Sequence, residues 1–167
     1  MKVQDVMTYD VRSCRPETNL AEAAMQMWRG DFGALPVVTT AGKVVGMVTD
    51  RDICIATATK HRDPANIRVK EVISGKVYGC SEDTDIRGAL KIMREKQVRR
   101  LPIISAEDGR LQGILSMNDL ALKGGTERNA ELSAEDVENT LRAICAHRAA
   151  LPAKPAQQPV AQQLAVA

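Results

Sequence analysis

The chain has 167 residues, of which 44% are hydrophobic and 26% are charged, a balance that is typical of globular proteins and excludes a chain disordered over most of its length. Its net charge of +2 comes from interspersed basic and acidic residues, and aromatic residues make up only 2%, so it lacks both the basic patch and the stacking rings typical of nucleic-acid binding. No apolar run reaches the roughly 18 residues of a membrane helix, and the first residues lack the apolar stretch of a signal peptide. We therefore expect a cytoplasmic protein with neither nucleic acid nor membrane among its partners.

Most of the chain consists of two copies of one unit. Shifting the sequence by 66 positions superposes nine identities within 36 positions, among them Cys14 on Cys80. One extra residue in the second copy then changes the shift to 67, which pairs Asp52 with Asp119. Internal repetition of this kind predicts two similar structural units.

Each copy predicts a strand, a helix, two strands and a second helix, in that order. In the first copy, Thr18 is the expected cap of a helix with apolar residues at helical spacing, and Gly30 is its expected end. The apolar runs 35–38 and 44–48, separated by a turn, predict a hairpin. The second copy repeats this pattern over residues 84–93, 101–104 and 111–115.

A single unit has too small a sheet face to bury by itself, so we expect the two copies to pack around a pseudo-two-fold axis as one module. The expected boundaries are residues 2–60 for the first unit, 61–68 for a polar connector and 69–124 for the second unit.

The end of the chain lies outside the repeat. Residues 132–149 predict an amphipathic helix that opens with a capping box and needs a partner surface on its own module or on another subunit. Its apolar stripe comprises Val137, Leu141, Ile144 and Cys145. Residues 150–167 are rich in Ala, Gln and Pro, and we expect them to be disordered.

The end of the last strand in each copy carries a glycine, a hydroxyl residue and an aspartate at three-residue spacing. These residues are Gly46, Thr49 and Asp52 in the first copy and Gly113, Ser116 and Asp119 in the second. A glycine at a strand end allows close approach of a ligand, a hydroxyl at a helix start favours phosphate, and the carboxylate can accept two hydrogen bonds from a ribose diol. The alternative is a capping box that satisfies helix N–H groups without a ligand. Because the pattern occurs twice at matched positions, we favour ribonucleotide binding.

Several segments share a recognisable pattern. They are residues 5–8 (Asp-Val-Met-Thr), 33–38 (Gly-Ala-Leu-Pro-Val-Val) and 46–52 in the first copy, and 98–104 and 113–119 in the second. Together they resemble the cystathionine β-synthase (CBS) domain. The resemblance implies an α/β (α+β) fold of two pseudo-symmetric βαββα units, a Bateman module, whose clefts often hold AMP, ADP, ATP, NAD or S-adenosylmethionine. It also implies a homodimer with Trp28 at the dimer surface, because paired modules of this family commonly stack their helices into a disc.

The resemblance also implies site residues. Ribose and phosphate contacts fall to Thr49 with Asp52 and to Ser116 with Asp119. The other residues expected to line the clefts are Thr8, Val11, Leu35, Pro36, Gly46, Ser74, Val77, Leu101, Pro102, Gly113 and Ile114. Because aromatic residues are so few, we expect a bound base to lie between aliphatic side chains.

The resemblance implies basic phosphate contacts in the second copy, whereas in the first copy Arg51 or Lys43 would have to supply them. Arg99 and Arg100 stand where related modules place such contacts, and a guanidinium pair suits that task. The first copy has Gly33 and Ala34 at the matched positions. Two equal anionic sites are therefore not expected.

The cysteines show no Cys-x-x-Cys spacing, and buried thiols are the favoured interpretation. The less favoured alternative is a zinc or redox site that joins Cys14 to the C-terminal part of another subunit, with Cys145 as the second candidate ligand. The sequence lacks a convergent catalytic set. We therefore expect a non-enzymatic regulatory or signalling module with an adenine nucleotide as regulatory ligand, no required cofactor and an unknown downstream protein. The alternative is a ligand-independent structural or interaction dimer.

Overall fold

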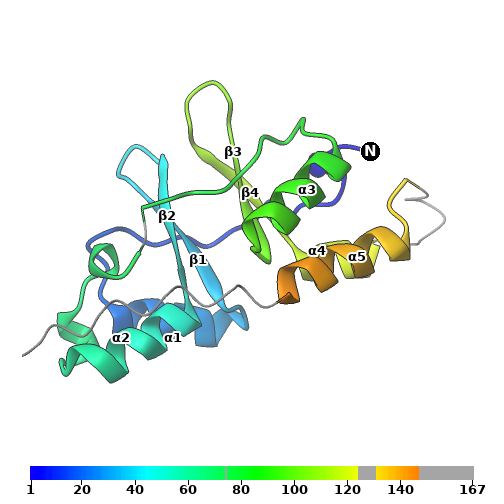
Figure 1. Ribbon diagram of the computed structural model, residues 1–167. Helices are drawn as coiled ribbons and strands as arrows, with labels where there is room; N and C mark the ends of the chain where they lie inside the picture. The colour runs from blue at the N-terminus through cyan, green and yellow to red at the C-terminus, as the bar shows by residue number, and fades with distance from the viewer. Residues whose placement is uncertain (74, 124–130, 147–167) are drawn as a thin grey trace, which may run out of the picture.

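Each half of the repeat forms a two-stranded antiparallel sheet with one helix before it and one after it (Figure 1). The computed structural model describes residues 1–73, 75–123 and 131–146. The first unit contains α1 (Leu20–Gly30), β1 (Ala34–Val38), β2 (Val44–Thr49) and α2 (Asp50–Lys60). The second contains α3 (Ile86–Lys96), β3 (Arg100–Ile104), β4 (Leu111–Ser116) and α4 (Met117–Lys123), and α5 (Ala134–Cys145) follows it. Helices and small antiparallel sheets together confirm the predicted fold class.

The repeat extends to the detail of the backbone. β1 and β3 each pair with the next strand, and both ladders have an irregularity at the matched place, between Val37 and Val38 and between Ile103 and Ile104. Both helices that precede the sheets end on a residue with left-handed backbone, Asp31 at φ 53° and Gln97 at φ 50°. Matched sequence positions therefore occupy matched structural positions throughout the two units.

The expected first strand of each unit is an extended segment that pairs at single residues. Cys14 forms a parallel bridge with Val37, and Cys80 forms the same bridge with Ile103. Thr8 bridges Ile114 of the other unit through two backbone hydrogen bonds of 2.9 Å. The prediction of a regular strand here was wrong, because the segment meets its neighbours one residue at a time and no continuous ladder forms.

The helix caps differ by one residue from the prediction. Asn19, and not Thr18, caps α1, because its side chain accepts a 2.8 Å hydrogen bond from the backbone N–H of Glu22. Thr18 Oγ1 instead accepts from the N–H of Arg15. Gly30 is the last residue of α1, as predicted, and Asp31 follows it as the C-cap. The residue in the left-handed conformation after α1 is Asp31, where glycine is more common.

The two units exchange their opening segments. Val3, Val6 and Met7 belong to the core of the second unit, whereas Ile67 and Val69 belong to the core of the first. Backbone hydrogen bonds fix both exchanges, from Val3 to Thr84 and from Val69 to Thr18, each at 2.9 Å. Burying each of these side chains contributes about 1.5–3 kcal/mol, so neither core is complete without a segment that precedes the other unit in the chain.

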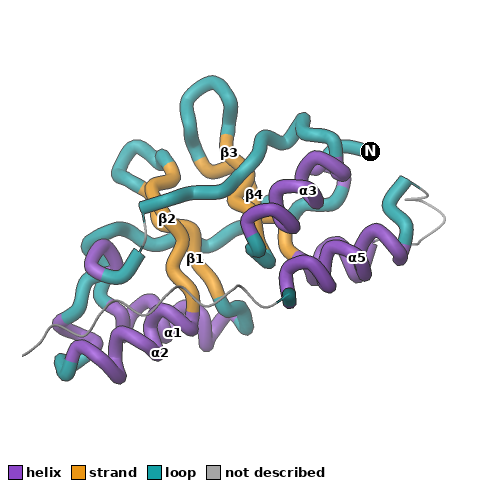
Figure 2. The backbone as a smooth tube through the Cα atoms, viewed as in Figure 1, coloured by secondary structure: helices purple, strands orange, loops and turns teal. Residues whose placement is uncertain are grey.

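Helix α5 packs against α3 and α4 of the second unit, and Figure 2 shows it beside α3. Leu132 and Thr140 are fully buried there, and Ile144 is nearly so. The partner surface is thus on the helix's own module. Leu141 and Cys145 of the predicted stripe are exposed, so that half of the stripe was predicted wrongly. Residues 150–167 lie outside the described residues.

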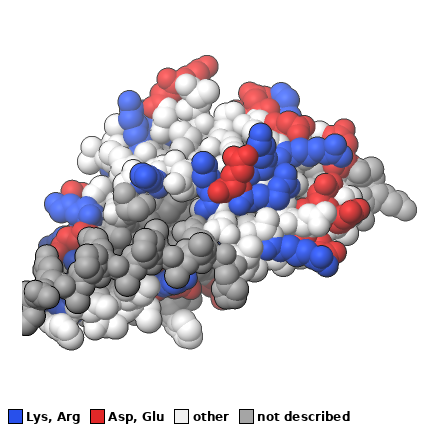
Figure 3. All heavy atoms as spheres, viewed as in Figure 1, with Lys and Arg blue, Asp and Glu red and all other residues white. Residues whose placement is uncertain are grey.

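The exposed charges are mixed in sign. On the face drawn in Figure 3, basic and acidic side chains alternate over both units. Ion pairs such as Lys2–Asp83 (2.6 Å) and Arg62–Glu71 (2.9 Å) join residues of opposite charge. Within the part of the chain that the structure describes, no helix is long and apolar enough to cross a membrane.

Candidate functional site

A cleft of about 470 Å³ lies between the two units, and we call it the inter-unit cleft. Its walls come from the extended segment that contains Thr8 and Val11, from the turn between α1 and β1, and from the junction of β4 with α4. The lining residues are Thr8, Asp10, Val11, Arg12, residues 30–34, Arg100, Ile114, Ser116, Asn118 and Asp119. The cleft exists because the Thr8 bridge ties the start of the chain to β4.

Asp119 is the most highly connected polar residue in the cleft. Its Oδ2 accepts hydrogen bonds from Ser116 Oγ at 2.6 Å and from the Ser116 N–H at 2.8 Å, and its own N–H donates to Ser116 Oγ at 3.2 Å. Thr8 Oγ1 donates to the other carboxylate oxygen, Oδ1, at 2.9 Å. The structure thus brings Thr8, from the start of the chain, to the Ser116 and Asp119 motif of the second unit.

The same geometry occurs at the matched place in the first unit. Thr49 donates to Asp52 Oδ2 from Oγ1 at 2.7 Å and from its N–H at 2.9 Å, and Asp52 N–H donates back at 3.2 Å. Both motifs therefore act as capping boxes. A carboxylate has about four acceptor positions, so Asp119, which is half-buried and faces the cleft, keeps acceptor capacity for a ligand.

The strand glycines have a structural reason. A Cβ on Gly113 would lie 2.7 Å from the carbonyl oxygen of Thr8, and a Cβ on Gly46 would lie 2.7 Å from Ile73 Cδ1. The opening segments, and not a ligand, approach these two glycines. The expectation that these glycines make room for a ligand is therefore corrected: they make room for the opening segments of the chain itself.

Four other expected lining residues lie in the core. Leu35 and Leu101 have no exposed surface, and Pro36 and Pro102 are buried beside them. They stand behind the cleft wall and do not reach a ligand in this conformation. The cleft does contain the expected aliphatic residues Val11 and Ile114.

The two arginines divide into one that lines the cleft and one that does not. Arg100 is half-buried and lines it, whereas Arg99 is exposed and contributes its carbonyl oxygen to a 3.0 Å hydrogen bond from Met117. Arg100 Nη2 lies 3.6 Å from the position of a Cβ on Gly33. That separation is an ordinary contact, whereas Asp50 Oδ2 would lie only 2.8 Å from the same Cβ, so the Asp50 carboxylate is the group that needs glycine at this position.

Several cleft residues escaped prediction. Asp10, Arg12, Asp31, Phe32 and Asn118 all line the cleft. Phe32 corrects the expectation of purely aliphatic walls, since it is an aromatic ring beside the site. With Arg12 and Arg100 against Asp10, Asp31 and Asp119, acidic groups slightly outnumber basic ones.

The matched set in the first unit is less completely described. Thr49, Asp52 and Gly46 stand together at the end of β2, and Val77 is half-buried in the segment before Cys80. Ser74 lies outside the described residues.

The cysteines do not gather. Cys14 is buried in the first unit, and burial raises the pKa of its thiol to about 11. Burial also raises the pKa of Cys80. Cys145 is exposed at the end of α5, on the second unit. Among the described residues, no three His, Cys, Asp or Glu side chains are placed to hold a metal ion.

The CBS domain family model matches residues 3–58 and 69–123. The chain belongs to the CBS domain family. Hypoxic response protein 1 of Mycobacterium tuberculosis is 35% identical over 118 residues, which are 71% of this chain and 81% of that protein. A 17.7 kDa protein of Acidianus ambivalens is 38% identical over 120 residues, 72% of this chain and 71% of that one. The predicted resemblance is confirmed.

Solved structures show the same fold. Hypoxic Response Protein I, solved with two coordinated zinc ions, superposes with a TM-score of 0.67 at 33% identity, over 74% of this chain and 98% of that one. A CBS domain pair in complex with 5′-methylthioadenosine and S-adenosyl-L-methionine gives 0.66 at 22% identity, over 73% and 94%. CBSX2 in complex with AMP gives 0.63 at 24% identity, over 71% and 91%.

Proposed function

We propose that this CBS pair is a regulatory, non-enzymatic module that binds an adenine nucleotide in the inter-unit cleft. The observation that carries the proposal is the Asp119 carboxylate, which Ser116 and Thr8 hold in place on the wall of a cleft that also contains Arg100. The volume of about 470 Å³ is within the usual range for small-molecule sites.

Each part of a nucleotide finds a suitable group. The Asp119 carboxylate can accept hydrogen bonds from a ribose diol, and the Arg100 guanidinium can pair with a phosphate. Val11, Ile114 and the ring of Phe32 offer apolar surface to the base. Because Asp10 and Asp31 add negative charge, we expect AMP to bind more tightly than ATP when no divalent cation is present.

Two structural neighbours support the ligand class. One CBS pair was solved with 5′-methylthioadenosine and S-adenosyl-L-methionine, and CBSX2 was solved with AMP. We extend the proposal to a second, unequal site at Thr49 and Asp52, with Ser74 and Val77, because the repeat places the same motif there.

Isothermal titration calorimetry with AMP, ADP, ATP, NAD and S-adenosylmethionine tests the proposal. Asp119→Ala should weaken binding at the inter-unit cleft by about tenfold or more, since it removes a charged acceptor. Asp52→Ala breaks the same kind of capping box away from the inter-unit cleft, so it should leave binding at that cleft unchanged and weaken only the second site proposed at Thr49 and Asp52. Absence of binding by all five compounds would refute the proposal.

The second candidate is a ligand-independent interaction dimer. It is favoured by the capping geometry, in which Thr49, Asp52, Ser116 and Asp119 satisfy one another without a ligand. This candidate predicts that both aspartate variants lower stability and that neither changes a response to nucleotide.

We also propose that the chain forms a cytoplasmic homodimer that signals to a downstream protein. Sedimentation analysis tests the dimer. An ATP concentration that stays constant on prolonged incubation tests the absence of hydrolysis.

A further inference from the structure

The repeat gives each residue that lines the inter-unit cleft a counterpart in the other unit. The counterparts lie at the end of β2 and the start of α2, in the extended segment before Cys80, and in the turn between α3 and β3. We call those that the structure describes, and that do not line the cleft themselves, the mirrored site. Its residues are Met47, Thr49, Arg51, Asp52, residues 76–78 and residues 96–99. The second, unequal nucleotide site proposed above belongs here.

The opening segments of the two units approach the strands at matched places. A Cβ on Gly113 would lie 3.1 Å from Met7 Cε. A Cβ on Gly46 would lie 2.7 Å from Cδ1 of Ile73, which is the counterpart of Met7. The opening segment of each unit thus meets the last strand of the other unit at the same position. The pseudo-two-fold axis therefore relates the mirrored site to the inter-unit cleft.

The end of α3 also meets the extended segment of its unit. Lys96 Nζ lies over the ring of Tyr78, 5.7 Å from the ring centroid. The counterparts of these two residues, Gly30 and Arg12, both line the inter-unit cleft. The contact between Lys96 and Tyr78 therefore joins two elements that, in the other half of the module, form two walls of the cleft.

The two sites differ in charge. In the inter-unit cleft, three aspartates stand against two arginines. At the matched positions of the mirrored site, lysine replaces both Asp10 and Gly30. Arginine replaces both Gly33 and Asn118. The four basic residues, all of them exposed, are Lys76, Lys96, Arg99 and Arg51. Among the described residues of the mirrored site, Asp52 is the only acidic one.

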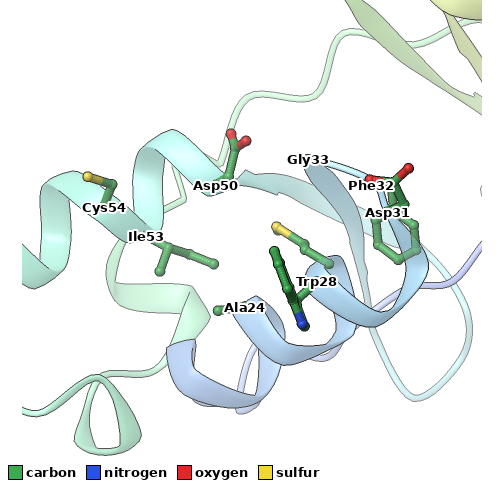
Figure 4. A pocket seen from close by; sticks show the side chains of 9 residues that line it. Ala24, Trp28, Asp31, Phe32, Gly33, Asp50, Ile53 and Cys54 are labelled. Carbon is green, nitrogen blue, oxygen red and sulfur yellow. The ribbon is translucent and has the colours of Figure 1, made fainter.

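A further carboxylate near this junction belongs to a different hollow. Asp50, next to Thr49 in the chain, lines a hollow of about 450 Å³ between α1 and α2, together with Asp31 (Figure 4). Met117, the counterpart of Asp50, is not among the residues that line the inter-unit cleft. Asp50 therefore stands outside the mirrored site. Even with Asp50 included, four basic residues stand against two carboxylates.

We propose that the mirrored site selects a nucleoside di- or triphosphate, whereas the inter-unit cleft selects a monophosphate. The inference rests on the proposed function, since it assigns a ligand class to the second site. A triphosphate carries more negative charge than a monophosphate, and lysine and arginine bind phosphate oxygens through charge-assisted hydrogen bonds. Because the four basic residues are exposed, each ion pair contributes modestly, and the preference should weaken as salt is raised.

Two variants separate the sites in calorimetry of the full chain without divalent cations. Asp119→Ala weakens the inter-unit cleft and so reports on the mirrored site, and Asp52→Ala does the reverse. In Asp119→Ala, ATP should bind about tenfold more tightly than AMP, because the longer phosphate chain adds exposed charge pairs. In Asp52→Ala, AMP should bind more tightly than ATP. Inorganic tripolyphosphate should displace ATP from Asp119→Ala and should not displace AMP from Asp52→Ala.

Charge variants locate the phosphate chain. In the Asp119→Ala chain, Lys96→Gln with Arg99→Gln should lower the affinity for ATP by about tenfold and bring it to within about threefold of the affinity for AMP. The matched control is Arg110→Gln with Arg142→Gln, which removes the same charge at exposed positions just before β4 and on α5. The control should leave the preference for ATP unchanged.

The same order of affinity for ATP and AMP in both aspartate variants would overturn the inference. So would ATP binding that tripolyphosphate does not displace or that Lys96→Gln with Arg99→Gln leaves unchanged, and so would an Asp119→Ala chain that binds no nucleotide while Asp52→Ala binds AMP. In each of these results a nucleotide still binds, so the proposed function stands. Absence of binding by every nucleotide would instead refute the proposed function, and this inference with it.

Discussion

Replacing Asp119 with alanine removes hydrogen bonds of two kinds from one carboxylate. Two come from Ser116 within the capping box, at 2.6 and 2.8 Å, and one comes from Thr8 in the other half of the module, at 2.9 Å. Loss of a helix cap costs about 0.5–2 kcal/mol. The bond from Thr8 is exposed to solvent. We therefore assign it the free energy of an ordinary net hydrogen bond, about 1 kcal/mol, and not the larger value of a buried bond to a charged group.

Asp52→Ala removes only the capping box of the first unit. We therefore expect Asp119→Ala to lower the free energy of unfolding by about 1 kcal/mol more than Asp52→Ala does. For a chain of this length, that difference corresponds to about 2–4 °C in Tm. Urea denaturation measures the free energies of unfolding. Equal m-values for the two variants would establish that both expose the same surface on unfolding, so that their free energies can be compared.

A double-mutant cycle isolates the bond between the units. Thr8→Val and Asp119→Ala should show a coupling energy of about 1 kcal/mol, because each removes the same hydrogen bond. Thr8→Val and Asp52→Ala should be additive, since those side chains share no hydrogen bond. Zero coupling in the first pair, or equal stability of the two aspartate variants, would refute the reasoning that Asp119 joins the two halves.

Three further predictions concern other parts of the molecule. Gly113→Ala should lower the free energy of unfolding by about 1–3 kcal/mol, because the new Cβ would lie 2.7 Å from the Thr8 carbonyl oxygen. Gly88→Ala within α3 should raise it by about 0.5–1 kcal/mol. Urea denaturation measures both, and a Gly113→Ala variant more stable than Gly88→Ala would contradict the packing described. Leu132→Ala should lower the free energy of unfolding by about 2–5 kcal/mol, because Leu132 is fully buried beside α5. Leu141→Ala changes an exposed position and should lower it by less than about 0.5 kcal/mol. Equal losses would argue against this packing of α5. The pKa of Cys14 is raised by burial to about 11, so the folded chain keeps its proton where the unfolded chain loses it, and stability should fall as pH rises from about 9 towards 11. Cys14→Ala should flatten that decline, and an unchanged slope would show that Cys14 is not its source.

The repeat made the fold predictable, and the limits of the prediction have local causes. Matched spacing located both hairpins and the helices before and after them, because apolar periodicity depends on neighbouring residues. The opening strand failed because strand structure depends on partners, and Cys14 and Cys80 find theirs at single bridges. The cap moved from Thr18 to Asn19 because both types can cap, and only the backbone geometry selects between them.

The site was predictable where a side chain has a fixed place in a motif. Ser116, Asp119 and Arg100 line the cleft as expected. Leu101 and Pro102 were misplaced because β3 is covered on both faces, and its central residues 101–103 are all buried. Asp31 and Phe32 were missed because they stand in a turn, and they reach the cleft only through the packing of one unit against the other.

The exchanged opening segments decide how the chain can fold. Val3 reaches Thr84 and Thr8 reaches Ile114, contacts that close loops spanning most of the repeat. Closing long loops before native contacts form is entropically costly, so such connections slow folding and link distant parts of the chain into one transition. If the chain were cut between the repeats, each half would carry the opening segment that completes the core of the other half, and its own core would be incomplete. Two copies of one unit in the sequence are therefore a single cooperative structure, and the cleft that opens between them exists only when both are folded.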